Sequence, residues 1–136
     1  MSLQPYVLIV DDEEICLTIT SEMVKKLGMP TMTARDGVEA VEVFEQHGHT
    51  IGCVLIDLQM PRMNGIDACR QIRNMDANVP LIIASGYLNA ANQALLEPLK
   101  PSAYLKKPVT FKDLSDLFGL LIPADDYQDS LPRNSG

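Results

Sequence analysis

The side chains that could do chemistry in this sequence are three carboxylates, one hydroxyl and one ammonium group. Each follows a short run that reads as a strand: Asp11, Asp12, Asp57, Ser85 and Lys107. Three carboxylates beside one lysine do not all ionise cheaply unless a cation joins them. Neither His nor Cys falls at these positions, so a bound ion would meet oxygen ligands. That donor set favours a hard ion, Mg²⁺ (or Mn²⁺).

One carboxylate of such a group is a candidate nucleophile. Asp57 would attack a phosphoryl group and form an aspartyl phosphate. Mg²⁺ would neutralise charge on the transferring oxygens, while Lys107 and the Ser85 hydroxyl would hold the others. Taken singly, these residues have plainer interpretations, as a turn-capping acid, a turn hydroxyl and a solvated lysine, with Asp11 and Asp12 as helix-start acids. Their joint placement at strand ends favours the chemical interpretation.

The elements that must position these residues alternate between strand and helix. Apolar runs predict strands at residues 6–10, 30–34, 52–56, 79–84 and 102–106. Helical periodicity predicts helices over about 15–27, 38–47, 66–72, 88–97 and 111–121. Such alternation gives a parallel sheet with helices on both faces. Right-handed crossovers bring the carboxyl ends of the strands to one edge, where ligands bind in open α/β sheets.

The first and fourth predicted helices carry specific expectations. Ile15, Ile19, Met23 and Leu27 recur every four residues, which predicts the buried face of the first helix. The fourth helix is less regular, because prolines bracket the connection that follows it. The prolines of the segment 97–103 therefore leave the length and order of that helix open.

Composition narrows the class of protein. The 136 residues suit one domain whose core needs no disulfide or metal. The three cysteines, Cys16, Cys53 and Cys69, fall in apolar segments and form no C-x-x-C pair, which predicts reduced core thiols in a cytoplasmic protein. The net charge of −7 argues against a nucleic-acid surface. No run of about 18 apolar residues predicts a membrane span, and no secretory signal is expected.

With these features together, the sequence resembles the receiver domain of two-component response regulators. The resemblance covers about residues 5–121, and residues 122–136 are expected to be a disordered tail or linker. Its motifs are Val10-Asp11-Asp12, Asp57-Leu58-Gln59-Met60-Pro61 with Asn64-Gly65, Ala84-Ser85-Gly86, and Tyr104-Leu105-Lys106-Lys107-Pro108. The resemblance implies a flavodoxin-like fold, a doubly wound, five-stranded parallel sheet of order 2-1-3-4-5. It also implies a signalling switch that catalyses its own phosphorylation and slow autodephosphorylation, rather than a metabolic enzyme.

The resemblance implies a metal site and a phosphoacceptor. Asp57 would receive the phosphoryl group. Asp12 would bind Mg²⁺ directly, Asp11 would act largely through bound water, and the main-chain carbonyl of Gln59 would complete the protein ligands.

It also implies a switch. Ser85, with Gly86 beside it, would bind the phosphoryl oxygens and move on activation. Tyr104 would change rotamer with it, and Lys107 would pair with the phosphate. Ser85 stands where Thr is more usual in this family, and we expect this change to preserve function. Gly86 stands where Ala is more usual, and we expect it to loosen the loop after the fourth strand.

The implied partners are a histidine kinase or a histidine phosphotransfer protein as phosphoryl donor. The fourth helix, fifth strand and fifth helix (the 4-5-5 face) would serve an output domain, a hybrid kinase in the parent chain, or a homodimer. Neither nucleic acid nor membrane is an expected partner of this segment.

Two other functions compete with the switch. A phosphohydrolase of the haloacid-dehalogenase type needs an acid two residues after its nucleophile, where this sequence has Gln59. A pseudo-receiver that only binds partners would be favoured by loss of Asp57, Asp12 or Lys107, all of which are present.

Overall fold

The computed structural model describes residues 5–58, 60 and 64–121. Within them, five strands form one parallel sheet of order β2-β1-β3-β4-β5, which confirms the predicted topology. The strands are β1 (Tyr6–Val10), β2 (Thr31–Ala34), β3 (Ile51–Asp57), β4 (Leu81–Ser85) and β5 (Ala103–Lys106). The α-helices are α1 (Glu14–Lys26), α2 (Gly37–His47), α3 (Gly65–Met75), α4 (Ala90–Leu96) and α5 (Phe111–Leu121). Short 3₁₀ helices follow α2 and α4, namely η1 (Gly48–Thr50) and η2 (Glu97–Leu99).

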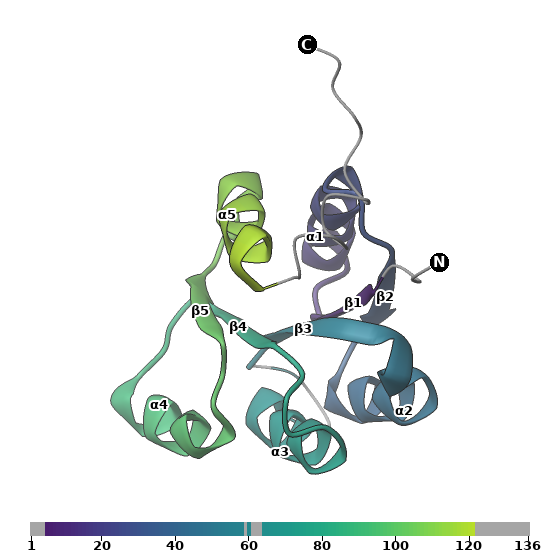
Figure 1. The fold of residues 1–136 in the computed structure, drawn as a ribbon. Helices are drawn as coiled ribbons and strands as arrows, with labels where there is room; N and C mark the ends of the chain where they lie inside the picture. Colours follow the sequence, from purple (N-terminus) through teal and green to yellow (C-terminus); the bar gives the residue numbers. More distant parts are fainter. Residues whose placement is uncertain (1–4, 59, 61–63, 122–136) are drawn as a thin grey trace.

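Helices cover both faces of the sheet. Helices α1 and α5 lie on one face, and α2, α3 and α4 lie on the other (Figure 1). Alternate residues of β1 serve the two sides, with Val7 and Ile9 packing towards α1 and α5 and Leu8 and Val10 towards the other layer. Because such strands are buried on both faces, their sequences are continuous apolar runs.

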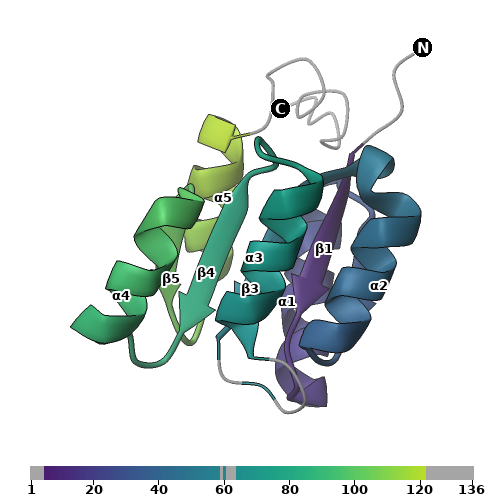
Figure 2. The ribbon, with the colours of Figure 1, turned by 90° about the horizontal axis from the view of Figure 1, so that it is seen from below.

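The strand register gathers the carboxyl ends of the strands at one edge. Val10 of β1 pairs with Ile56 of β3, and Asp57 pairs with Ala84 of β4. Figure 2 shows the arrowheads of β1 and β4 pointing towards the same edge. A slip of one residue would turn the buried side chains to the wrong face, so packing on both sides fixes this alignment.

The predicted buried face of α1 is wrong in its first half, at Ile15 and Ile19. It is right in its second half, where Leu27 is buried and Met23 packs against the core. Ile15 is 74% exposed and Ile19 is 54% exposed, whereas Leu17, Ser21 and Val24 are buried. Positions two apart lie about 200° apart around an α-helix, so burying the stripe that contains Leu17 turns Ile15 and Ile19 outwards.

Two hydrogen bonds form the start of α1, and packing of Leu17 in the core accompanies the rotation. Asp11 accepts a hydrogen bond from the Glu13 amide (3.0 Å), and the Glu13 carbonyl accepts one from the Leu17 amide (2.9 Å). From this start, Leu17 faces the sheet and packs in the core cluster that contains Phe118 of α5.

Helix α4 has 7 residues and is shorter than the predicted segment 88–97. Its first turn is capped by Asn89, whose side chain accepts a hydrogen bond from the Asn92 amide (2.7 Å). The helix gives way to η2, whose second residue is Pro98. The helical segment therefore runs over residues 90–99 in two forms.

The prediction that the cysteines are core residues is right for Cys53 and Cys69 and wrong for Cys16. Cys53 and Cys69 are buried, and burial raises the pKa of each thiol to about 12, so both are poorly reactive. Cys16 is only half-buried on α1, so its placement in the core was wrong.

Two predictions concern membranes and the end of the chain. No described helix is long and apolar enough to cross a membrane. The predicted tail, 122–136, lies outside the described residues.

Candidate functional site

Three predicted acids meet at the carboxyl edge of the sheet. One carboxylate oxygen each from Asp11, Asp12 and Asp57 lie within 4.8 Å of one another. Asp11 and Asp57 are buried, at 5% and 7% exposure, whereas Asp12 is exposed. A cation bound by these oxygens would therefore be enclosed by protein at Asp11 and Asp57 and open to solvent at Asp12.

Lys107 holds two of the acids. Its Nζ donates to Oδ2 of Asp11 (2.6 Å) and to Oδ2 of Asp57 (3.2 Å). The Lys107 main-chain amide donates to the Ser85 carbonyl (3.0 Å), which ties the segment after β5 to the end of β4. Burial alone would lower the pKa of Lys107, but the hydrogen bond to Asp11 and the charges of Asp57 and Asp11 raise it above its usual value. The ammonium group therefore stays charged at neutral pH.

A glycine lets the start of α3 lie against the backbone of the phosphoacceptor candidate. A Cβ atom on Gly65 would lie 2.3 Å from the Asp57 carbonyl oxygen and 2.6 Å from Cα of Leu58. The Gly65 amide donates to the Leu58 carbonyl (2.8 Å), and Asn64 caps α3 through the Asp67 amide (2.9 Å). The Asn64-Gly65 pair thus starts α3 against the backbone of Asp57, which requires a residue without a side chain.

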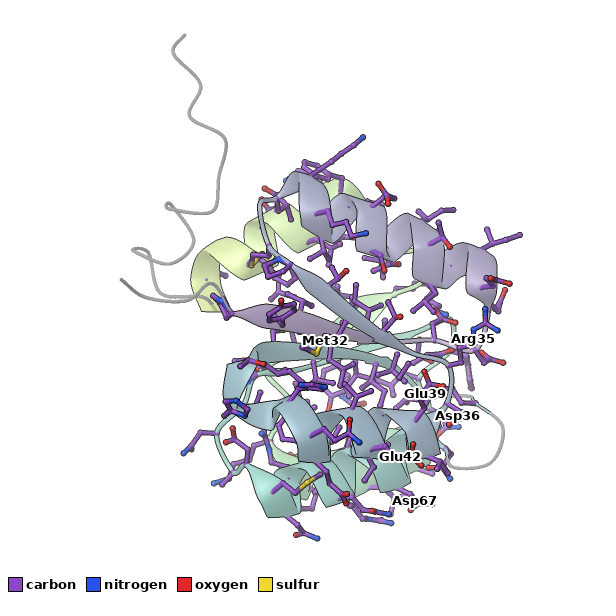
Figure 3. The ribbon with its side chains drawn as sticks, turned by 90° about the vertical axis from the view of Figure 1, so that its right-hand side faces the viewer. Met32, Arg35, Asp36, Glu39, Glu42 and Asp67 are labelled. Atoms are coloured by element: carbon purple, nitrogen blue, oxygen red, sulfur yellow. The ribbon has the colours of Figure 1, made fainter. Side chains whose placement is uncertain are left out.

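More acids lie at the start of α2 and α3. Asp36 caps α2 by accepting from the Glu39 amide (2.8 Å), and Asp67 lies in the first turn of α3. Figure 3 shows Asp36 and Glu39 on the same side of the molecule as Arg35, at the end where α1 begins. The donor set of Asp11, Asp12 and Asp57, all oxygen, fits a hard divalent cation.

Ser85 lies at the same edge but uses its hydroxyl elsewhere. Its Oγ donates to the Tyr87 carbonyl (2.8 Å) and accepts from the Tyr87 amide (3.2 Å). A cavity of about 380 Å³ opens beside it, between the ends of β4 and β5, and is lined in part by Gly86, Tyr87 and Tyr104. Ser85 is a turn hydroxyl in this structure, with open space behind it.

The remaining predicted residues differ in exposure. Tyr104 is 37% exposed on the edge strand β5. Gly86 is exposed, and a Cβ atom there would meet nothing within 4 Å. Gln59, predicted to offer its main-chain carbonyl to the metal, lies outside the described residues.

Two features of the site region were not anticipated as functional. The exposed Ile15 and Ile19 stand on α1, the helix that begins beside Asp11 and Asp12. Glu14 at the start of α1 pairs with Arg35 (2.8 Å), which ties α1 to the segment after β2. The acidic run before α1 signalled a helix start, but no sequence pattern showed that its isoleucines face solvent.

Comparison with known proteins decides the family. A family model for the response regulator receiver domain matches residues 7–118. The chain belongs to this family. The receiver domain is 33% identical over 115 residues to the autoinducer 1 sensor kinase/phosphatase LuxN of Vibrio campbellii, covering 85% of this chain and 13% of that protein. It is 35% identical over 122 residues to the regulator of RpoS of Escherichia coli, covering 87% of this chain and 35% of that protein.

Solved structures agree with the fold. A response regulator receiver domain protein of Clostridium thermocellum has a TM-score of 0.80 at 29% identity, covering 87% of this chain and 94% of that one. The complex of CheX, CheY, BeF3 and Mg²⁺ from Borrelia burgdorferi contains a chain with a TM-score of 0.80 at 25% identity, covering 88% and 90%. The receiver domain spans only 13% and 35% of the two sequence relatives, so it corresponds to one part of each.

Proposed function

We propose that this receiver domain accepts a phosphoryl group on Asp57 from a phosphohistidine donor, with Mg²⁺, and acts as a switch. The observation that carries the proposal is the meeting of three carboxylate oxygens within 4.8 Å, with Lys107 bonded to Asp11 and Asp57. Such a site suits phosphoryl transfer, whose catalysis consists mainly of positioning and charge stabilisation.

Asp11, Asp12 and Asp57 are the residues that would hold the metal. Bound there, Mg²⁺ supplies positive charge against the oxygens of the transferring group. Asp12 is exposed and open to direct ligation, whereas Asp11 already accepts from the Glu13 amide and from Lys107. This difference supports a direct role for Asp12 and a water-mediated role for Asp11.

The transfer step itself belongs to Asp57. An Asp57 carboxylate oxygen attacks phosphorus, and a new O–P bond forms as the N–P bond of the phosphohistidine breaks. The bonding pair stays with the imidazole nitrogen, which leaves as neutral imidazole when the other ring nitrogen carries a proton. Lys107, 3.2 Å from Asp57 Oδ2, is placed to exchange a carboxylate partner for a phosphoryl oxygen.

The switch is proposed to run through Ser85. A phosphoryl group on Asp57 would draw the Ser85 hydroxyl away from the main chain of Tyr87, releasing two hydrogen bonds. Tyr104 lines the cavity beside Ser85 and has room to turn inwards. The domain would then have two packings whose balance phosphorylation shifts, on the 4-5-5 face.

The donor is proposed to dock on α1. Ile15 and Ile19 present apolar surface on the helix that begins at the acid cluster, as a protein carrying a phosphohistidine would require. An Ile19→Ser variant should lose phosphorylation by a protein donor but keep phosphorylation by acetyl phosphate, which needs no docking surface. Equal loss with both donors would contradict a docking role.

The relatives support a place in two-component signalling. LuxN is named a sensor kinase/phosphatase, and the Borrelia complex holds CheY with BeF3 and Mg²⁺. We infer a histidine kinase or histidine phosphotransfer protein as donor, and an output domain or hybrid kinase within a longer parent chain. No metabolite would be turned over, and the phosphoryl group would leave by slow hydrolysis.

A labelling experiment with a matched control tests the proposal. The wild-type domain with Mg²⁺ and radiolabelled acetyl phosphate should gain a hydroxylamine-sensitive acyl phosphate, and Asp57→Asn should gain none. Asp116→Asn is the control, because Asp116 is exposed on α5, pairs with Lys112 and is not among the three acids that meet at the site. Label that survives in Asp57→Asn would overturn the assignment of the phosphoacceptor.

A further inference from the structure

Arg73 joins three segments at the opposite edge of the sheet from the phosphorylation site. From α3, its Nε donates to the Leu99 carbonyl (2.7 Å) and its Nη2 to the Lys100 carbonyl (3.1 Å). Its Nη1 donates to the carbonyls of Val79 (2.5 Å) and Asp76 (3.3 Å). One guanidinium group therefore ties the end of η2 to the connection between α3 and β4.

The bonded carbonyls explain why a cation lies here. The last carbonyls of a helical segment have no partner within the helix, and a positive charge near them is favourable. Lys100 follows η2 with φ 55° and ψ 58°, a left-handed turn that directs the chain into β5. Burial lowers the pKa of Arg73, while the charge of Asp76 raises it, and an arginine remains charged in either case.

The two ends of α4 are held differently. Near its carboxyl end, Leu96 is fully buried, and the following η2 is bonded to Arg73. Near its amino end, Ala90 and Ala91 are exposed, and so is Leu95 further along the outer side. The amino end also follows directly on the Ser85 turn, whose hydrogen bonds the proposed switch would release.

We propose that Arg73 makes the carboxyl end of α4 a fixed pivot. A change at Ser85 then displaces the amino end of α4 and leaves residues 97–101 in place. The proposal rests on the proposed function for the origin of that change, but the anchoring by Arg73 does not depend on it. Arg73 is a positioning residue in this scheme, since it lies far from the acid cluster.

Hydrogen exchange of the metal-free protein tests the anchor alone. The Lys100 amide bonds to the Glu97 carbonyl (3.0 Å), so its exchange reports on the end of η2. Arg73→Gln should speed exchange of this amide about tenfold or more, since hydrogen bonds from a charged donor are lost. Arg73→Lys keeps the charge but not the fork of donors and should fall between. Arg70→Gln is the control, because Arg70 is on the same helix but its side chain is 47% exposed.

Beryllofluoride with Mg²⁺, a mimic of the phosphoryl group, tests the pivot. In the wild type, amide signals of residues 86–92 should shift and those of 97–101 should not. In Arg73→Gln, or in Arg73→Lys if the first variant fails to fold, the shifts should spread to 97–101.

The outcomes separate the two proposals. Unchanged exchange at Lys100 in both Arg73 variants overturns the anchor, and shifts at 97–101 in the wild type overturn the pivot. A wild type with no shift near Asp57 counts against the proposed function, while the metal-free exchange rates still decide whether Arg73 anchors η2.

Discussion

A basic side chain holds together each edge of the sheet, but the partners differ. At the carboxyl edge, Lys107 is bonded to the carboxylates of Asp11 and Asp57. At the opposite edge, where the strands begin (the amino edge), Arg73 is bonded to main-chain carbonyls, including those of Leu99 and Lys100. A carboxylate pair attracts other cations, which can replace the ammonium group, whereas scattered carbonyls offer a second cation far less.

The difference suggests a division of roles. Lys107 is a strongly hydrated point charge on a flexible stem, which suits a group that changes partners. Arg73 has a planar fork of donors, which suits a group that keeps several carbonyls in fixed positions. The carboxyl edge is thus arranged for exchange and the amino edge for constancy, and the following predictions test that contrast.

The largest effect is expected from adding a side chain at Gly65, which lies against the backbone of Asp57. In Gly65→Ala, the new Cβ would lie 2.3 Å from the Asp57 carbonyl oxygen, so the start of α3 or the end of β3 must move. We expect a loss of about 2–4 kcal/mol in the free energy of unfolding, measured by urea denaturation. Phosphorylation should fall as well, because Asp57 would be displaced.

Gly86→Ala is the matched control for this change. A Cβ at Gly86 meets nothing within 4 Å, so its stability should stay within about 1 kcal/mol of the wild type. Similar losses in both variants would mean that close approach is not what selects Gly65.

A smaller effect is expected from removing the ammonium group of Lys107. Lys107→Met leaves the carboxylates of Asp11 and Asp57 without their ammonium partner and should cost the metal-free protein about 1–3 kcal/mol. Mg²⁺ should then restore more stability than it does in the wild type, because it no longer competes with a lysine. Thermal unfolding with and without Mg²⁺ measures both. A variant that Mg²⁺ stabilises less than the wild type would contradict exchange.

The pH dependence follows from the direction of the shift. The pKa of Lys107 is raised above its usual 10.5, so its contribution is fully present below about that pH and is lost only as pH rises further. The difference in stability between wild type and Lys107→Met should therefore stay constant from about pH 7 to 9.

Much of the carboxyl edge could be predicted from sequence because it depends on topology. The alternation of strands and helices predicts parallel strands. Because the carboxyl ends of parallel strands lie at one edge, Asp11, Asp57 and Lys107 are placed together. Side-chain partners were harder. The Ser85 hydroxyl bonds within its own turn, as its residue type alone predicts, whereas its placement beside the other site residues predicts a role in phosphate binding.

The amino edge could not be predicted, and neither could the rotation of α1. Arg73 and Leu99 are separated by 26 residues, and nothing in their spacing indicates a contact. On α1, the stripe with Ile15 and Ile19 is more apolar than the stripe with Leu17 and Ser21, so periodicity selected the wrong face for the first half of the helix. Tertiary packing against the sheet and α5 decided which face is buried.

A buried hydroxyl without a partner can be used to measure what an unpaired polar group costs in the stability of this domain. Ser21 Oγ is buried on α1 and has no hydrogen-bond partner among the described residues. Ser21→Ala should stabilise the domain by about 1 kcal/mol, because an unpaired buried group is removed and alanine favours helix. Thr18→Ala, on the exposed side of the same helix, controls for helix propensity. A destabilised Ser21→Ala would mean that unpaired polar groups cost little here, and would weaken the argument for Arg73.

The smallest effect is expected at the amino edge itself. Lys100 adopts a left-handed conformation, at φ 55°, that costs a residue with a side chain more than it costs glycine. Lys100→Gly should raise the free energy of unfolding by about 0.5–1 kcal/mol, since the gain exceeds the added flexibility of the unfolded chain. The carbonyl that accepts from Arg73 and the amide that donates to Glu97 are both kept, so hydrogen exchange at residues 97–101 should not quicken. Faster exchange would show that the Lys100 side chain helps to hold this edge. The contrast between a main-chain clamp and an exchangeable side-chain pair would then need revision.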